Sequence, residues 1–424
     1  MVTTTQMSPA APRPEHVPLE VVYDFDYRAD PGLLENAHSR VLELVREAPP
    51  IFWTPRNGGH WIIRGHSAVF QAFRQPEEFT VEMVPFADIQ AQRSALRPGE
   101  PEPLVALPNS IDPPNHEAYR TPLKSAFSPK AMLALKDDIR GLAAELIEAV
   151  KPLGHCEFMA SIAEPLPVTV FLKLFGLPVE RQREYRAVVK EHFSASLLLD
   201  AVGSQRRLRT VADIMRDTIL DRRDNPCDDV ISLLWQSEFY GKPATLNDLE
   251  SYCVMLFLAG LDTVMNGMGL GMHHLATHPQ LQSELRAAPT LIPEATEELI
   301  RRYTFTIPPR FVARDLVFMG LTMKKGEMAL LFLPAADLDP HEYLDPQNFN
   351  MARENRGHIA FGAGPHRCLG SHLARIELQT LYQEILRRLP DFRLNPDKPV
   401  RYHGGHVWGP DELHLLWGRS RVPP

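Results

Sequence analysis

The chain has 424 residues, of which 44% are hydrophobic and 23% are charged, a composition typical of globular proteins and unlike that of disordered or fibrous chains. The formal net charge is −8 and the basic residues are spread along the chain, so we expect no nucleic-acid-binding surface. The four cysteines lie far apart without a C-x-x-C pair, which argues against a zinc site and a disulfide framework and favours a reducing cytoplasm.

The first residues do not resemble a targeting segment. Residues 1–20 are polar and rich in proline, without the charged start and apolar run of a signal peptide or anchor, and we expect a disordered tail. Residues 21–424 are expected to form a single domain. The longest apolar stretches, Val254 to Leu261 and Met328 to Leu333, are too short to cross a bilayer, so we predict a cytoplasmic protein without membrane association.

The chain begins with β-like segments and continues as helices. Around residues 50–65, the run IFWTPRNGGHWIIRG predicts a strand pair with a turn at Asn57-Gly58-Gly59. Residues 82–110 are irregular and rich in proline, which suggests a lid or a substrate loop. Amphipathic periodicity predicts a helical core around 114–302, including a long helix from Leu246 through Ala276.

The second half of the chain completes a mainly α protein with a small β portion. A helix is predicted from Thr290 to Arg302, followed by a β-rich lobe around 305–335 that joins the one around 50–65. The last helix covers residues 368–390 and is predicted to begin at Cys368 or Leu369. The C-terminal segments are predicted to form strands and turns.

The decapeptide FGAGPHRCLG, from Phe361 to Gly370, carries the clearest chemical signal. Its three glycines permit backbone conformations closed to other residues and close approach to a flat, bulky group. At a helix start, Cys368 would have free N–H groups and the helix dipole beside it, which favour a thiolate that acts as nucleophile or metal ligand. A lone cysteine in a glycine turn is more often a small buried hydrophobic residue, so the loop alone leaves both interpretations open.

The full string, Phe361-Gly362-x-Gly364-x-x-x-Cys368-x-Gly370, fills every position of the haem-binding loop of the cytochrome P450 family, the haem-thiolate monooxygenases. The chain resembles this family over nearly its whole length. The resemblance implies the P450 fold and haem b with Cys368 as its axial thiolate, which favours O–O cleavage. It also assigns these residues to haem binding: His116, Arg120, Ala259, Gly260, Arg310, Phe361, Gly362, His366 and Gly370.

A second motif is a glutamate and an arginine three residues apart in ATEELIRRY. Glu298 and Arg301 share a helix face, and such a pair is most often an exposed surface pair. In the family it is a buried support of the cysteine loop. Asn348 occupies a place where many members have the arginine that completes this network, whereas Arg353 and His358 match the family pattern.

A third motif lies in the long helix, in LAGLDTVMN. Gly260 costs about 1 kcal/mol relative to alanine in a helix, and close helix packing is the simplest reason for it. The segment Ala259-Gly260-x-Asp262-Thr263 is also similar to the family's oxygen-activation motif. That similarity makes Thr263 the hydroxyl that binds the activated oxygen and Asp262 the relay of protons from water. Otherwise, an acid on this face would be an unpaired buried charge.

Three segments, LDTVMN, AADLDP and GGHVWG, resemble the bacterial camphor-hydroxylating branch of the family. The resemblance implies electrons from a [2Fe–2S] ferredoxin and its NADH-dependent reductase. An acidic ferredoxin would dock on the proximal face, where charge could come from Arg120, Lys124, Arg353, Arg356 and Arg367. Glu117 stands where this branch tends to carry a cation, so the partner preference is open.

The same resemblance predicts an apolar substrate pocket. Leu104 replaces the tyrosine that hydrogen-bonds the substrate in the camphor branch, so camphor itself is not expected. His406 and Trp408 could add a polar contact, and we predict a small-to-medium hydrophobic substrate, a terpenoid or an aromatic compound. The expected lining residues are Leu104, Val105, Leu107, Met255, Leu258, Thr306, Ile307 and Val407.

Three functions remain in competition: a monooxygenase that uses O2 and ferredoxin, a peroxygenase driven by hydrogen peroxide, and a haem-binding sensor without catalysis. Peroxide-driven members usually replace the acid–alcohol pair, and a sensor needs no proton relay. Asp262 and Thr263 therefore favour the monooxygenase.

Overall fold

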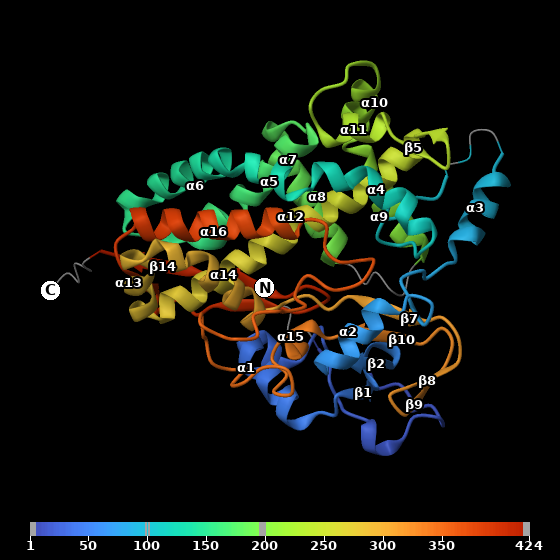
Figure 1. Ribbon diagram of the computed structural model, residues 1–424, viewed down its shortest axis with the longest axis horizontal. Helices are drawn as coiled ribbons and strands as arrows, with labels where there is room; N and C mark the ends of the chain where they lie inside the picture. Colours follow the sequence, from blue (N-terminus) through green and yellow to red (C-terminus); the bar gives the residue numbers. More distant parts are fainter. Residues whose placement is uncertain (1–5, 98–99, 101, 195–200, 419–424) are drawn as a thin grey trace. The chain divides into compact units, whose positions relative to one another are not determined.

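The computed structural model describes residues 6–97, 100, 102–194 and 201–418 (Figure 1). The chain divides into two compact units, which are described separately below. Unit 1 comprises Met1–Thr80, Lys136–Ala163 and Met265–Pro424, and unit 2 comprises Val81–Leu135 and Glu164–Val264.

Unit 1 contains the predicted β lobe, a five-stranded sheet in the order β1-β2-β10-β7-β3. β2 pairs antiparallel with β1 and parallel with β10, which brings segments more than 260 residues apart into one sheet (Figure 1). The strands of this sheet are β1 (Ile51–Thr54), β2 (His60–Ile63), β3 (Phe79–Thr80), β7 (Pro309–Val312) and β10 (Met328–Leu331). A three-stranded sheet and two strand pairs complete the β structure of unit 1. The three-stranded sheet has the order β11 (Phe392–Leu394), β14 (His414–Trp417), β4 (His155–Glu157). The two pairs are β8 (Leu316–Phe318) with β9 (Leu321–Met323) and β12 (Arg401–His403) with β13 (Gly409–Glu412).

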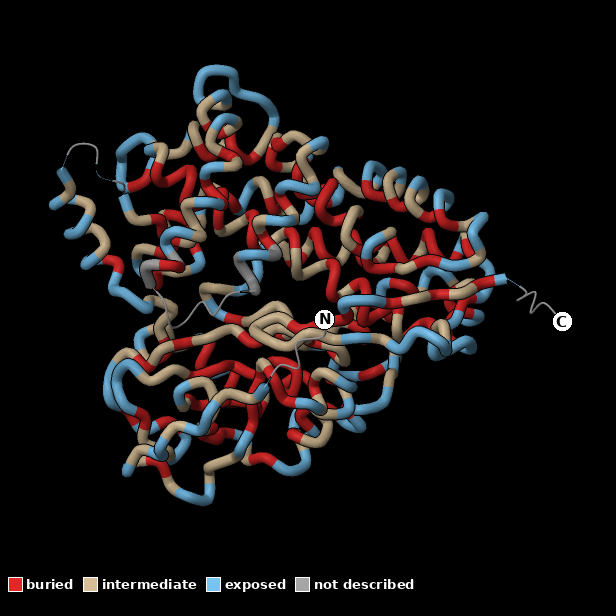
Figure 2. The backbone as a smooth tube through the Cα atoms, turned by 180° about the vertical axis from the view of Figure 1, so that it is seen from behind, coloured by how far each residue is buried: buried red, intermediate tan, exposed pale blue. Residues whose placement is uncertain are grey.

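Three strands of the five-stranded sheet, β1, β2 and β10, are buried on both faces, because their alternate side chains enter two different hydrophobic clusters. Trp61 and Ile63 of β2 pack in one cluster with Phe73, whereas Ile62 between them packs in the other with Val41. Figure 2 shows buried residues running through the interior segments and exposed residues gathered at the turns. The strands are apolar without alternation because both faces need apolar residues.

The helices of unit 1 cover this sheet and build a second layer. They are α1 (Pro31–Glu47), α2 (His66–Arg74), α6 (Lys136–Val150), α13 (Pro279–Ala287), α14 (Ile292–Arg302), α15 (Leu333–Ala336) and α16 (Ser371–Arg388). α16 packs against α6 and α14, and Figure 1 shows α6 and α16 side by side. Asp30 caps α1 by accepting hydrogen bonds from the N–H groups of Gly32 and Leu33, with Pro31 as the first helical residue.

The N-terminal segment is ordered where it was predicted to be disordered. Val17 is completely buried, and the Ser8 hydroxyl donates to Asp26 at 2.9 Å. The Ala11 N–H donates to the Pro55 carbonyl at 2.8 Å. Apolar and backbone groups of residues 6–20 therefore find partners in unit 1, which a polar, proline-rich composition does not reveal. Residues 1–5 of the predicted tail lie outside the described part.

Unit 2 is almost entirely helical. It contains α3 (Phe86–Ser94), α4 (Asn115–Ala126), α5 (Pro129–Ala134), α7 (Pro165–Phe175), α8 (Gln182–Ser194), α9 (Ala201–Asp213), α10 (Arg216–Asp224), α11 (Val230–Trp235) and the short strands β5 (Glu238–Phe239) and β6 (Lys242–Pro243). The loop predicted over 82–110 is interrupted by α3. Its first turn packs Phe86 against the ring of Tyr119, an apolar contact that stabilises a helix in an otherwise polar segment.

The long helix predicted from Leu246 through Ala276 is confirmed as α12 (Leu246–Thr277, 32 residues). Its residues to Val264 belong to unit 2 and those from Met265 belong to unit 1. In the described part of the chain, α12 alone has the length and apolar composition of a membrane-crossing helix, and 56% of its most apolar window is buried inside the protein. Such burial is typical of a core helix, and by itself the match is weak evidence for a membrane span.

The turn between β1 and β2 allows a matched test of backbone conformation. Gly58 and Gly59 both have positive φ, as predicted, but a Cβ on Gly59 would lie 2.6 Å from the Trp53 ring, whereas a Cβ on Gly58 would meet nothing within 4 Å. We expect Gly59→Ala to lower the free energy of unfolding by about 3 kcal/mol and Gly58→Ala by about 1 kcal/mol. Urea denaturation measures both, and equal losses would contradict a role for the Trp53 contact.

Candidate functional site

The loop from Phe361 to Gly370 closes on itself through backbone hydrogen bonds. The Cys368 N–H donates to the Phe361 carbonyl at 2.8 Å, and the Arg367 N–H donates to the Gly364 carbonyl at 3.2 Å. Gly362 and Gly364 have φ of +70° and +66°, in the region that favours glycine. The cysteine is thus held by the loop's own backbone.

The helix after the loop begins later than predicted. α16 starts at Ser371 with Gly370 as its N-cap, so neither Cys368 nor Leu369 opens it. The residues from Cys368 to Gly370 continue the turn, because the Cys368 N–H is engaged across the loop at Phe361. The thiol therefore lies just ahead of the helix N-terminus.

The loop packs against α2 and brings Arg310 into the same neighbourhood of unit 1. A Cβ on Gly364 would lie 2.4 Å from the Phe73 carbonyl oxygen, and one on Gly362 would lie 3.4 Å from the Phe73 ring. The buried Arg310 guanidinium of β7 lies 5.1 Å from the centre of the same ring. Only glycine at position 364 permits this approach, and Phe73 links the loop to Arg310.

None of the four cysteines, all of which lie in the described part of the chain, forms a disulfide, and Cys368 combines exposure with a shaped loop. Cys156 and Cys253 are buried, and burial raises the pKa of the Cys156 thiol to about 12 and also raises that of Cys253. Both therefore remain protonated at neutral pH. Cys227 is exposed, in the turn before α11.

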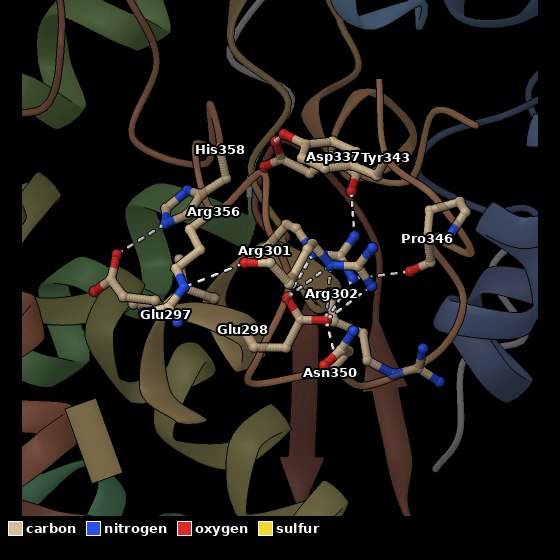
Figure 3. A network of polar contacts seen from close by, with 12 residues as sticks. Glu297, Glu298, Arg301, Arg302, Asp337, Tyr343, Pro346, Asn350, Arg356 and His358 are labelled. Atoms are coloured by element: carbon tan, nitrogen blue, oxygen red, sulfur yellow. Dashed lines mark hydrogen bonds and ion pairs between the residues drawn. The ribbon is translucent and has the colours of Figure 1, made fainter. Parts of the chain in front are cut away.

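Glu298 and Arg301 form a buried, bidentate ion pair in α14, not the exposed pair that is usual for this spacing (Figure 3). Both contacts, Nε to Oε2 and Nη2 to Oε1, are 2.8 Å long. Arg301 also donates to the carbonyls of Asp337 at 2.7 Å and Pro346 at 2.9 Å. One guanidinium thus joins α14 to two points of the chain ahead of the cysteine loop.

Arg353 completes this network, which resolves the question raised by Asn348. The Arg353 guanidinium lies 3.2 Å from Glu298 and is buried. It donates to the Asn348 carbonyl at 2.9 Å and to the Leu344 carbonyl. Asn348 therefore takes part in the network through its backbone carbonyl. The second cation beside the Glu298 carboxylate is Arg353, five residues further along the chain.

A parallel clamp at Glu297 was not predicted from the sequence. The Glu297 carboxylate binds Arg375 of α16 at 2.7 Å and the His358 ring at 3.2 Å. The Arg375 guanidinium lies 4.5 Å from the centre of the Phe361 ring, the first residue of the cysteine loop. The doubled glutamate of ATEELIRR was the one sequence signal for this clamp. Arg375 gave none, because its helical segment has no pattern that sets it apart.

Residues 259–263, which the resemblance assigns to oxygen activation, lie on α12 within unit 2. The Thr263 hydroxyl donates to the Ala259 carbonyl at 2.9 Å, and Ala259 is exposed in this apolar helix. A Cβ on Gly260 would lie 2.4 Å from the Phe171 ring, so close packing against α7 requires glycine there. This contact supports the packing interpretation of Gly260.

Asp262 is not the unpaired charge considered in the sequence analysis. Its carboxylate lies 3.7 Å from Arg186 of α8, which also binds Glu164 at 3.1 Å. The Asp262 and Arg186 side chains keep 18% and 13% of their exposure, so the pair is partly accessible to water. Any proton transfer through Asp262 must compete with this ion pair.

The remaining predicted haem partners lie in both units. His116 and Arg120 are on α4 in unit 2, four residues apart as predicted, with His116 buried. His366 lies in the cysteine loop of unit 1. Glu117 binds Lys124 at 2.5 Å on the surface, so each of these two charges is neutralised by the other.

The predicted pocket residues lie in both units, and most of them are buried. In unit 2, the Val105 N–H donates to Ser251 of α12 at 3.2 Å, and Leu258 of that helix is buried like Leu104, Val105 and Leu107. Met255 is half-buried on the same helix. In unit 1, Thr306 forms a β-bridge with Val407. Ile307 is fully buried in a core cluster of unit 1.

His406 and Trp408 also have structural roles instead of the polar contact predicted for them. The His406 Nδ1–H donates to the Ile307 carbonyl at 3.1 Å, and the Tyr27 hydroxyl lies 3.3 Å from Nε2. Burial lowers the pKa of His406 to about 4, so the ring is neutral. Trp408 belongs to the same core cluster as Ile307.

Comparisons with known proteins give the family. A family model described as cytochrome P450 matches residues 204–403. The chain is 32% identical over 417 residues to "Probable cytochrome P450 127A1" of Sinorhizobium fredii, covering 96% of this chain and 97% of that protein. It is 31% identical to the steroid C26-monooxygenase of Mycolicibacterium smegmatis, covering 84% and 87%. The crystal structure of CYP101J2 has a TM-score of 0.84 and 32% identity, covering 96% of this chain and 100% of that one.

The chain therefore belongs to the cytochrome P450 family and has the P450 fold. It is a haem monooxygenase, and haem b with a cysteine thiolate ligand is the cofactor of the family. The described residues fit this cofactor. The Cys368 thiol is exposed in a glycine loop, and Arg310 is a buried cation beside that loop.

Arg353 and Asn348 offer a matched test of the Glu298 network. Lysine at position 353 keeps the charge, but a single ammonium cannot bind the carboxylate and several carbonyls together. We expect Arg353→Lys to lower the free energy of unfolding by about 3 kcal/mol and to reduce haem content. Asn348→Ala keeps the backbone carbonyl and should change stability by less than about 0.5 kcal/mol. Equal effects in denaturation and pyridine haemochrome assays would contradict this assignment.

The clamp at Glu297 predicts a pH dependence of stability. Burial alone would raise the pKa of Glu297, but hydrogen bonds from His358 and Arg375 outweigh it and lower the pKa to about 2, from 4.5. The stabilisation is therefore present above about pH 4.5 and is lost as the pH falls towards 2. We expect the stability difference between the wild type and Glu297→Gln to shrink over this range in urea denaturation. A difference that stays constant would exclude a contribution from the ionised carboxylate.

Proposed function

We propose that Cys368 is the axial ligand of the haem and that the enzyme hydroxylates a small-to-medium hydrophobic substrate, with electrons from a [2Fe–2S] ferredoxin and an NADH-dependent reductase. The observation that carries this proposal is the exposed thiol of Cys368, in a loop whose Gly364 packs against α2 and which the Glu297 and Glu298 clamps connect to α14. Bound haem thiolate supplies the cleavage of O2, with one atom inserted into a C–H bond and the other reduced to water by two electrons and two protons.

The chain's own residues then bind the cofactor's edges. We assign His116, Arg120, Arg310 and His366 to the two propionates, because carboxylates with buried edges need cationic or hydrogen-bonding partners. Ala259 and Gly260 of α12, with Phe361, Gly362 and Gly370 of the loop, are proposed to contact the macrocycle. Small residues and glycines suit this role because they allow close approach to a flat group.

Asp262 and Thr263 are proposed to hold and move protons. The Thr263 hydroxyl donates to the Ala259 carbonyl, so its oxygen remains able to accept a hydrogen bond. Asp262, partly accessible to water, can exchange protons with solvent when its ion pair with Arg186 loosens. The acid–alcohol pair favours O2-dependent turnover over the two alternatives, a peroxide-driven peroxygenase and a haem-binding sensor.

The substrate and partner proposals rest on the same family comparison. The residues proposed to line the pocket are Leu104, Val105, Leu107, Met255, Leu258, Thr306, Ile307 and Val407. Structures of CYP101J2 and CYP101C1, both at a TM-score of 0.84, support the ferredoxin-dependent reading. Arg356 and Arg367 are exposed and can bind an acidic partner, whereas Arg353 is committed to Glu298. We place the enzyme in the cytoplasm.

Spectroscopy tests the ligand assignment. We expect the reduced, carbon-monoxide-bound wild type to show the strongly red-shifted Soret band of thiolate ligation, because the anionic sulfur donates to iron. Cys368→His should lose this band, and Cys227→Ser, at another exposed cysteine, should keep it. A histidine-type spectrum in intact wild-type protein would overturn the proposed function. NADH-dependent turnover with a surrogate ferredoxin, compared with peroxide alone, separates the monooxygenase from its alternatives.

Substrate class is tested by displacement of the haem-bound water. We expect monoterpenes and small aromatic compounds to produce the low-spin to high-spin absorption shift, because apolar side chains favour compact hydrophobic ligands. Discrimination among similar shapes should be weak, about 10-fold to 200-fold per added methylene. A panel in which only large polar molecules cause the shift would refute the proposed class.

A further inference from the structure

The segment from Glu102 to Val105 lies in neither a helix nor a strand, yet Leu104 and Val105 retain only 3% and 5% of their exposure. Backbone N–H and C=O groups in such a buried segment must find partners elsewhere. Here the partners are side chains that come from three helices of unit 2. The path of this segment is therefore decided by those side chains.

Gln205 of α9 binds both backbone groups of Leu104. Its Oε1 accepts from the Leu104 N–H at 3.0 Å, and its Nε2–H donates to the Leu104 carbonyl at 2.9 Å. A primary amide can satisfy an N–H and a C=O at once, as a neighbouring strand would. This two-point contact fixes the rotation of the backbone at Leu104 and hence the direction of its side chain.

Three further side chains hold the flanking residues. Arg209, one turn after Gln205 on α9, donates to the Glu102 carbonyl at 2.8 Å and binds Glu250 of α12 at 2.5 Å. Arg93 of α3 donates to the Pro103 carbonyl at 3.2 Å. Ser251 of α12 accepts from the Val105 N–H at 3.2 Å. The segment cannot shift without breaking contacts to α3, α9 or α12.

We propose that Gln205 is a positioning residue for substrate selection: through its two hydrogen bonds to Leu104 it sets the wall of the pocket that Leu104 and Val105 form. Gln205 itself is exposed and acts through the backbone of the loop. The assignment of Leu104 to the pocket rests on the proposed function, whereas the hydrogen bonds do not. The two parts can therefore fail separately.

Hydrogen–deuterium exchange of the haem-loaded protein tests the contact itself. We expect Gln205→Ala to accelerate exchange in peptides containing Leu104 by roughly tenfold, because one protecting acceptor is lost and the segment loosens. Gln205→Glu keeps an acceptor but cannot donate to the Leu104 carbonyl. Exchange near Leu104 in this variant should therefore lie between that of the wild type and that of Gln205→Ala. Arg206→Ala, at the next exposed position of α9, is the control and should match the wild type. Unchanged exchange in Gln205→Ala would overturn the proposal.

Two azole probes test selection by size. Imidazole and 4-phenylimidazole both bind haem iron, but only the larger one extends far enough to touch a pocket wall. We expect the ratio of their dissociation constants to change by roughly threefold or more in Gln205→Ala and to remain constant in Arg206→Ala. The role in selection would be refuted if Gln205→Ala exchanged faster near Leu104 but kept the wild-type ratio of dissociation constants. This conclusion requires that the protein shows the carbon monoxide spectrum of thiolate ligation. A wild type without that spectrum would refute the proposed function instead, and the exchange comparison would still decide the contact at Leu104.

Discussion

The carboxylate of Glu298, bound by two buried guanidiniums, is the contact on which the order of unit 1 around the cysteine loop depends. Arg301 and Arg353 use their remaining donors to bind backbone carbonyls, so one buried anion orders a stretch of chain that has no regular secondary structure. Figure 3 shows Glu298 with Arg301 and Pro346. Buried charges carry a large desolvation penalty, and loss of any one member leaves the others uncompensated. The network therefore acts as a single unit, which suits a segment that must hold the thiol in place.

Beside the Glu298 network, Glu297 connects to the cysteine loop through two other residues, Arg375 and His358. Through Arg375 it connects α14 to α16 and to the ring of Phe361, while His358 anchors the segment just ahead of the loop. The two adjacent glutamates thus hold the chain on both sides of Cys368. Together with the close approach of Gly364 to α2, they leave the loop few alternative conformations. A thiolate ligand benefits from such rigidity, because surrounding hydrogen bonds tune its donation to a metal.

Unit 2 holds an irregular segment in place through side chains that bind its backbone, one of which, Arg209, also pairs with the buried Glu250. The segment around Leu104 has no strand partner, and the amide of Gln205 takes that place. On α12, Asp262 is held by Arg186 from α8, so the acid of the proposed proton relay is also part of an ion pair between helices. Helix α8 therefore supports Asp262, which the family resemblance assigns to proton transfer, and helix α9 supports Leu104, which it assigns to substrate contact. Neither helix carries a recognisable sequence motif.

The sequence by itself determined the mainly α fold, the β lobe, the long helix and the identity of the candidate ligand, because these depend on local periodicity, turn residues and a ten-residue motif. It did not determine that residues 6–20 are ordered, that α16 begins only at Ser371, or that Ile307 lies in the core. It also left open which residue completes the Glu298 network, and only the tertiary structure showed that Arg353 does. These features depend on contacts between segments distant in the chain, and burial and hydrogen-bond partners are properties of the folded molecule that local patterns do not contain.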